Sequence, residues 1–195
     1  MLDTSVSLLE RIASDGQDKD WERLLSIYRP FIDSQVRRYP QLIDQADDIA
    51  QEIAMVLVRE LPQFQRHRVG SFRVWLRQVA VNQIRNASRK QKVQPIAIGD
   101  SPSIEEQLEE LSNPASLASK RWNDEHDQEV LRRVIEIVRE EVNPTHWQAF
   151  QAHVLDGKSA DQVSRDLGIT INMVHLAKSR ITKRMQSEVK GLIGP

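Results

Sequence analysis

The sequence predicts an all-α protein made of two small helical domains. Apolar residues recur every three or four positions through nearly every segment, which is the spacing of amphipathic helices. The alternation typical of strands is absent, and the few glycine and proline signals fall where helices should stop. A chain of 195 residues can form one large domain or two small ones, and its charge distribution favours two.

The charge distribution is uneven although the net charge is only −1. Residues 21–92 carry 13 basic and 7 acidic side chains, and residues 168–195 carry 5 basic and 1 acidic. Between these blocks, residues 93–129 carry 2 basic and 9 acidic side chains. Two cationic blocks flanking an acidic connector predict a first domain at 1–92, a flexible acidic linker at 93–121 and a second domain at 122–195.

Several classes of protein are excluded by composition. The chain has no cysteine, hence no disulfide framework and no thiolate zinc site. The first 25 residues hold no apolar run of signal-peptide length, and no segment approaches a membrane span. The five histidines lack ligand spacing, and no glycine-rich phosphate loop is present. We therefore expect a soluble, cytoplasmic protein that is not an enzyme and uses no metal or cofactor.

The first domain should be a four-helix bundle. A short amphipathic helix is expected at 3–14, and a second helix from Asp18 that Pro30 should kink or split. The third helix is expected at 45–61, with aspartates in its first turn, where the helix dipole favours anions. The fourth begins near Ser71.

The fourth helix, within the stretch from Gly70 to Lys92, is the candidate nucleic-acid-binding element. One side is apolar, and another carries a stripe of arginines four or eight residues apart: Arg73, Arg77, Arg85 and Arg89. From Arg66 to Lys92 there are eight basic residues and no acidic one. Phe72 and Trp75 are more often core residues than stacking platforms at such spacing, and that packing would still aim the arginines outward. A helix buried on one side and cationic on another fits an anionic partner, and we infer nucleic acid.

The second domain ends in a helix-turn-helix pattern. Ser159 caps a short helix that Gly168 ends, and Thr170 caps the next one. Hairpins of solenoid proteins look alike, but here the outward face of the second helix is polar and basic: Asn172, His175, Ser179, Arg180, Lys183 and Arg184. This face predicts a helix that enters the major groove of DNA.

These stretches resemble a known family. ADDIAQEIAMVLVRELPQF (46–64) and GSFRVWLRQVAVNQIRNASRK (70–90) resemble conserved region 2 of bacterial RNA polymerase sigma factors, most closely the small extracytoplasmic-function (ECF) group. WQAFQAHVLDGKSADQVSRDLGITINMVHLAKSRITKRM (147–185) resembles region 4 of the same group. The resemblance implies a transcription initiation factor that directs core RNA polymerase to specific promoters and helps to melt the −10 region.

The resemblance also implies roles for individual residues. The clamp of the largest polymerase subunit would be bound by four polar side chains: Asp47, Asp48, Gln51 and Glu52. Without the resemblance, Asp47 and Asp48 would be interpreted as charges on a solvated first turn of a helix. The −10 element would be bound and melted by Arg73, Trp75, Arg77, Asn82, Arg85, Asn86, Arg89 and Lys90, with Asn82 lining a pocket for an extruded base. The −35 element would be bound by Thr170, Asn172, His175, Lys178, Ser179, Arg180, Lys183 and Arg184.

The expected partners are core RNA polymerase (the clamp of its largest subunit and the flap of its second-largest subunit), promoter DNA and an anti-sigma factor, with no membrane insertion. The recognition helix reads NMVHLAKSR where the family pattern is closer to GTVKSRLHR, so base preference cannot be carried over. The alternative is a helix-turn-helix repressor or activator, with the N-terminal bundle as a dimerisation or effector module. A nucleic-acid enzyme is a third class, which no constellation of carboxylates or histidines supports.

Overall fold

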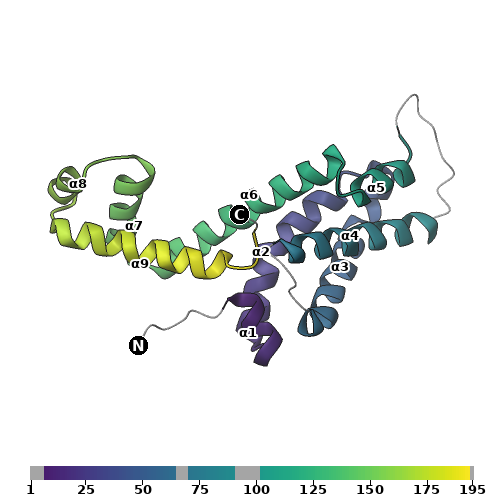
Figure 1. Cartoon of the computed structure of the whole chain (residues 1–195), viewed down its shortest axis with the longest axis horizontal. Coiled ribbons are helices and arrows are strands. Elements are labelled where there is room, and N and C mark those ends of the chain that lie inside the picture. Colours follow the sequence, from purple (N-terminus) through teal and green to yellow (C-terminus); the bar gives the residue numbers. More distant parts are fainter. Residues whose placement is uncertain (1–6, 65–69, 91–101, 194–195) are drawn as a thin grey trace.

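The computed structural model describes residues 7–64, 70–90 and 102–193, and within these ranges it contains helices and no strand. The all-α prediction is confirmed. One long helix, α6 (Leu117–Glu141), runs through the middle of the molecule (Figure 1). α4 and α5 pack against the first part of α6 and α9 against its last part, while α2 contacts both parts, and the molecule is elongated (Figure 1).

The N-terminal bundle contains α1 (Leu8–Asp15), α2 (Asp18–Val36), α3 (Ala46–Glu60) and α4 (Ser71–Lys90). Two 3-10 segments, Pro40–Gln45 and Leu61–Gln63, flank α3. α1 starts after a capping box in which the Ser7 hydroxyl accepts from Glu10 N and the Glu10 carboxylate accepts from Ser7 N. The expected start at residue 3 lies outside the described residues.

Pro30 lies inside α2, which is one continuous helix, so of the two expected effects, a kink or a split, the split does not occur. A proline has no N–H for the carbonyl four residues earlier, which here belongs to Ser26. That carbonyl instead accepts a hydrogen bond at 3.2 Å from Nε of Arg133 on α6. A tertiary contact thus replaces the missing helical bond.

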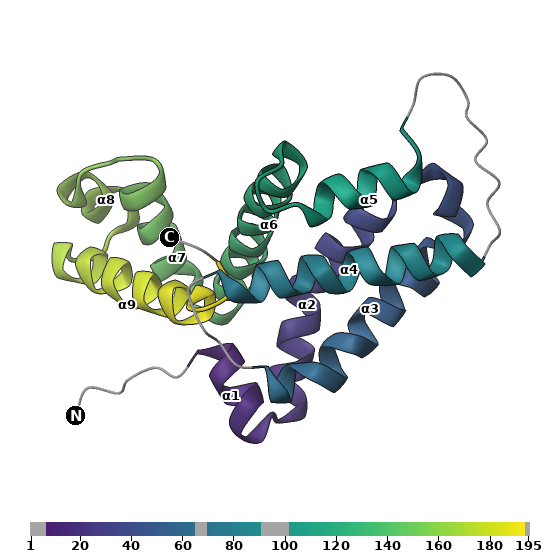
Figure 2. The same cartoon turned by 45° about the vertical axis from the view of Figure 1, so that its right-hand side comes forward.

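The described part of the acidic connector, residues 102–121, is mostly helical rather than a flexible linker, and it includes a helix where the sequence allowed at most a helical turn at 104–111. Helix α5 (Ile104–Ser112) has its own capping box at Ser103 and Glu106, and α6 begins at Leu117. α5 packs on α4 and on α6 (Figure 2), burying Ile104, Leu108 and Leu111. Acidic residues lie on the exposed side of a helix whose other side is apolar. Residues 93–101 lie outside the described range.

α6 connects the two halves of the chain. Its first half packs on α2 through the buried Trp122 and on α4 through Asn123 and Asp127, and its second half packs on α9 (Ile171–Val189). One apolar cluster therefore extends from Leu8 in α1 to Leu192 beyond α9. The boundary expected at 121/122 falls inside α6, and the division into domains 1–92 and 122–195 stays a prediction.

The C-terminal helices are α7 (Pro144–Phe150), α8 (Ala160–Leu167) and α9, with a π-helical turn, Gln151–Leu155, after α7. A second, smaller core joins α7, α8 and α9 through Ala149, Val163, Val174 and Ala177. This core fixes the angle between α8 and α9. Over the described residues, the structure contains no helix of the length and apolarity that a bilayer span requires.

Candidate nucleic-acid interface

Helix α4 is the centre of the N-terminal candidate site. Its apolar side is buried in the bundle: Phe72, Leu76, Val79, Ala80, Val81 and Ile84. Burying each such side chain contributes about 1.5–3 kcal/mol, so the rotation of α4 about its axis is firmly set. The remaining sides of the helix present the polar residues that the sequence singled out.

The arginine stripe (Arg73, Arg77, Arg85 and Arg89) was expected to face open solvent, but most of it does not. Arg77 is only 4% exposed and donates from Nη1 to Oδ1 of Asn123 at 3.0 Å and to the Ser119 carbonyl at 3.4 Å. Arg73 is paired with Asp127. All three acceptors belong to α6, so Arg73 and Arg77 face that helix.

Arg85 has its partner on α5. Its Nε donates to Oε1 of Glu105 at 2.8 Å.

The charge of the stripe is unaffected by these contacts. Burial, and secondarily the neighbouring charge of Arg73, lowers the pKa of the Arg77 guanidinium. Arginine stays protonated in proteins, so the stripe keeps its charge although three of its four members are engaged by α5 and α6.

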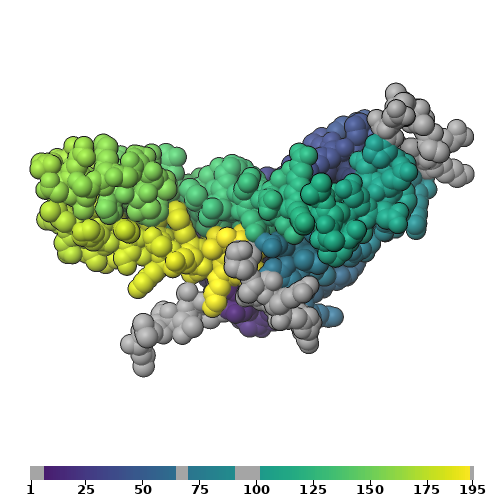
Figure 3. Space-filling model, turned by 45° about the horizontal axis from the view of Figure 1, so that its top comes forward, coloured from purple at the N-terminus to yellow at the C-terminus, as the bar shows by residue number. Residues whose placement is uncertain are grey.

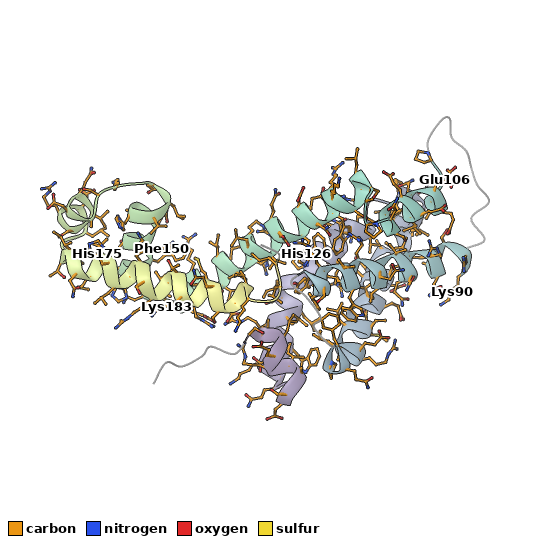
Figure 4. The ribbon with its side chains drawn as sticks, in the orientation of Figure 1. Lys90, Glu106, His126, Phe150, His175 and Lys183 are labelled. Atoms are coloured by element: carbon orange, nitrogen blue, oxygen red, sulfur yellow. The ribbon has the colours of Figure 1, made fainter. Side chains whose placement is uncertain are left out.

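A second side of α4 is open to solvent. It is lined, at helical spacing, by Gln78, Asn82, Asn86, Arg89 and Lys90. Nε2 of Gln78 donates to Oδ1 of Asn82 at 3.2 Å, which orients the Asn82 amide along the helix. Lys90 lies at the far end of α4 (Figure 4). Asn82, Asn86, Arg89 and Lys90 are thus the predicted −10 residues that this conformation leaves accessible.

Trp75 occupies an aromatic cluster at the start of α4. Its ring centroid lies 5.2 Å from that of Phe64 and 5.6 Å from that of Phe72, and the side chain is half-buried. This agrees with the core-packing interpretation of Phe72 and Trp75. Residues 65–69 of the preceding loop lie outside the described residues.

Helix α3 presents the predicted polymerase-binding residues together. Asp47, Asp48, Gln51 and Glu52 are all exposed, opposite a buried side of α3 that faces α2 and α4. Asp47 accepts a hydrogen bond from Arg37 at 2.6 Å. Sequence reasoning missed Met55, which continues this surface and is 50% exposed. The sequence could have indicated Met55, because it lies three residues after Glu52 and therefore on the same face of the helix.

Helices α8 and α9 have the caps and the short connecting turn that the sequence predicted for a helix-turn-helix. The Ser159 hydroxyl accepts from Gln162 N, and the Thr170 hydroxyl accepts from Met173 N, both at 3.2 Å. Gly168 ends α8 with φ of 64°, the left-handed conformation that glycine adopts without strain. The turn is therefore short and fixed at both ends, and it holds α9 at a set angle to α8.

The exposed face of α9 carries most of the predicted −35 residues: Thr170, Asn172, His175, Lys178, Ser179, Arg180 and Lys183. His175 projects from α9 near the outer end of the molecule, and Lys183 lies further along the same helix (Figure 4). The His175 ring makes an edge-to-face contact with His153 of the π-helical turn, with centroids 5.7 Å apart. Helical periodicity gave no signal for this contact between α9 and the π-helical turn.

Arg184 lies apart from this face. It binds Glu141 of α6 at 3.0 Å and also pairs with Glu188, whose side chain is 1% exposed. Arg23 of α2 pairs with the same two carboxylates. In this conformation Arg184 therefore anchors α9 to α6 and α2, and its predicted role as a DNA contact stays a prediction.

The described residues contain no group of three or more histidines, cysteines or carboxylates arranged to hold a metal ion. What the two surfaces offer instead is a set of amides and cations on α4 and on α9, separated along the length of α6. Amides and cations are the groups that contact bases and phosphates.

A protein-family model matches the N-terminal part of the chain. Residues 24–93 match the family model described as Sigma-70 region 2, a segment that runs from within α2 to beyond the end of α4. No curated protein matches the chain. A Sigma-70 region 2 domain implies a role in promoter recognition and transcription initiation, with core RNA polymerase and promoter DNA as partners. The match points to a DNA-recognition subunit that is not itself an enzyme.

Proposed function

We propose that the chain is a sigma factor of the ECF group, which directs core RNA polymerase to specific promoters and helps to melt their −10 region. The observation that carries the proposal is the exposed strip of α4, from Asn82 to Lys90, inside the segment that matches Sigma-70 region 2. A helix-turn-helix at the other end of α6 supports it, because promoters of this kind have two separate elements.

At the −10 element, Asn82 would bind an extruded base while Arg89 and Lys90 neutralise the backbone. Extruding a base costs a few kcal/mol, which stacking and phosphate contacts offset. The amide of Asn82 has the donor and acceptor that a base edge requires, and its exposure leaves it accessible. The stripe arginines would add further neutralisation once they are released from α5 and α6.

At the −35 element, α9 would lie in the major groove. Asn172, His175, Lys178, Ser179 and Arg180 would lie nearest the bases or phosphates, and Lys183 would bind phosphate. The exposure of these residues and the fixed turn before Thr170 support this role.

The proposed polymerase contacts are the clamp of the largest subunit for the α3 surface and the flap of the second-largest subunit for the C-terminal helices. Asp47, Asp48, Gln51 and Glu52 suit the first contact because they share one exposed face. An anti-sigma factor that occludes these surfaces is a further proposed partner. The protein would act in the cytoplasm, where RNA polymerase works.

A helix-turn-helix repressor or activator is the competing function. Such a protein binds duplex DNA tightly by itself, as a dimer on a palindrome, whereas a sigma factor binds weakly alone and acts through core polymerase. Run-off transcription with and without purified core enzyme, beside a duplex-binding assay of the chain alone, separates the two. A transcript that requires both chain and core supports the proposal; tight dimeric binding with no such transcript contradicts it.

A further inference from the structure

The polar groups opposite the arginine stripe come from a single stretch of chain, residues 103–127. Along α5 and the first part of α6, Glu105 meets Arg85, Asn123 and the Ser119 carbonyl meet Arg77, and Asp127 meets Arg73. All of these partners are oxygen acceptors. A guanidinium binds carboxylate and phosphate oxygens with the same forked geometry, so these groups occupy positions that phosphates could take.

This stretch is a helical hairpin with its own internal connection. The Ser119 hydroxyl lies within hydrogen-bond distance of the carbonyls of Leu111 (2.7 Å) and Asn113 (2.6 Å), which joins the start of α6 to the end of α5. The Ser116 hydroxyl caps α6. On the face shown in Figure 3, the surface of α5 and of the start of α6 adjoins that of α4.

The two halves of the hairpin are held with unequal strength. α6 is anchored by Trp122, which is 2% exposed and makes an edge-to-face contact with Phe31 of α2 at 4.9 Å. α5 has nine residues, of which Ile104, Leu108 and Leu111 are buried. A helix of this length is marginal in water without packing, so α5 is the part that separates most readily.

We propose that residues 103–127 form an intramolecular cover over the arginine stripe, and that DNA and this cover compete for the same guanidinium groups. The free chain is then held in a state of low DNA affinity, and α5 leaves Arg85 first when a nucleic acid binds. The identity of the competing polyanion as DNA rests on the proposed function. The competing explanation is that the arginines only hold the helices together.

The first test measures binding of the full chain, without polymerase, to a fluorescein-labelled 20-nucleotide single-stranded DNA of mixed sequence. The variant Glu105→Gln with Asp127→Asn removes the two carboxylates that pair with the stripe. The matched control, Glu110→Gln with Asp124→Asn, makes the same charge change at exposed positions of the same two helices that form no described ion pair with α4. Both carry the same net charge, so a difference between them is local.

The cover variant should bind the oligonucleotide about four- to 25-fold more tightly than the control, because each partly exposed ion pair that is lost shifts the equilibrium about two- to fivefold. Adding Arg85→Ala to the cover variant should remove most of this gain. Equal affinities of the cover and control variants, with helix content unchanged by circular dichroism, overturn the proposal. So does a gain that survives Arg85→Ala.

Hydrogen exchange on the unmodified chain tests the same inference without any substitution. Saturating oligonucleotide should speed exchange of the α5 amides about tenfold or more while the core of α2 stays protected. Unchanged or slower exchange in α5 when DNA is bound overturns the cover. Neither assay contains polymerase, so the cover can fail while promoter-dependent transcription succeeds, and the reverse.

Discussion

Nη1 of Arg77 donates a hydrogen bond to Oδ1 of Asn123 at 3.0 Å, across the contact between α4 and α6. The two residues are 46 positions apart, and Arg77 is among the most buried charged residues in the described part of the chain. A residue expected to face DNA therefore holds two helices together. Arg89 and Lys90, at the end of the same helix, are exposed. Substitutions can therefore separate the structural role of Arg77 from DNA binding by Arg89 and Lys90.

Arg77→Ala should lower the free energy of unfolding by about 2–4 kcal/mol. The change leaves Oδ1 of Asn123 without the Arg77 donor, removes the side-chain donor to the Ser119 carbonyl, and opens a cavity between α4 and α6. Urea unfolding followed by circular dichroism measures the loss. Arg89→Ala, on the exposed strip, is the matched control and should change stability by less than about 0.5 kcal/mol while weakening DNA binding. Equal losses of stability would contradict this division.

Asp48→Arg should weaken binding to core polymerase about tenfold or more, because it places a cation in the middle of the acidic α3 surface. DNA binding by the C-terminal helices should be unchanged, and the free energy of unfolding should fall by no more than about 1–2 kcal/mol, because the anion is lost and a cation added in the first turn of α3. Asp15→Arg, an equal charge change at an exposed position of α1, is the control. Titration of labelled core enzyme measures the affinity, and an unchanged affinity for the Asp48 variant would remove α3 from the polymerase interface.

Arg180→Ala and Lys183→Ala should differ in kind. A base contact by Arg180 is worth about 1–3 kcal/mol and is lost only on the preferred −35 sequence. Lys183, as a phosphate contact, should weaken binding to every sequence alike and reduce its salt dependence. Competition between matched and scrambled upstream elements distinguishes the two. A sequence-independent loss for Arg180→Ala would make it a phosphate contact as well.

The free energy of unfolding should depend on pH through His126, which lies where α6 crosses the bundle (Figure 4) and is fully buried. Burial lowers the pKa of the His126 imidazole, against the opposing effect of Asp127, to which Nδ1 is hydrogen-bonded. Protonation therefore favours the unfolded chain. The stability is full above the unfolded pKa of about 6.5 and is lost as pH falls below it.

From pH 7.5 to 5.5 the free energy of unfolding should fall by up to about 1.4 kcal/mol through this single group. Urea unfolding at the two values measures the difference. His126→Gln lowers stability at both values and should remove most of the difference between them. If the variant keeps the same pH dependence as the unmodified chain, other groups are responsible.

Local signals predicted much of the fold and part of the site. Ser159, Gly168 and Thr170 mark the ends of α8 and α9 because a cap or a left-handed turn is encoded within a few residues. The exposed faces of α3 and α9 follow from helical periodicity in the same way. These features need no knowledge of distant parts of the chain.

The errors concern contacts between distant segments. Periodicity gives the side of α4 on which Arg77 and Arg85 lie, but their partners are 46 and 20 residues away. The acidic, proline-containing connector resembled a linker because the apolar side of α5 has only three residues to reveal it. Pro30 was expected to kink or split α2, and the contact from Arg133 that satisfies the Ser26 carbonyl in the undivided helix comes from α6. Tertiary partners decided each case.

The most direct test of the proposed function is promoter selection with reconstituted holoenzyme. Purified chain and core RNA polymerase are given a library of DNA templates with randomised upstream sequence, and the run-off transcripts are sequenced. The account predicts transcripts that require the chain and that share two elements at a fixed spacing, with Asn82→Ala impairing opening at the downstream one. No chain-dependent transcript from any template, with an active core enzyme, would contradict it.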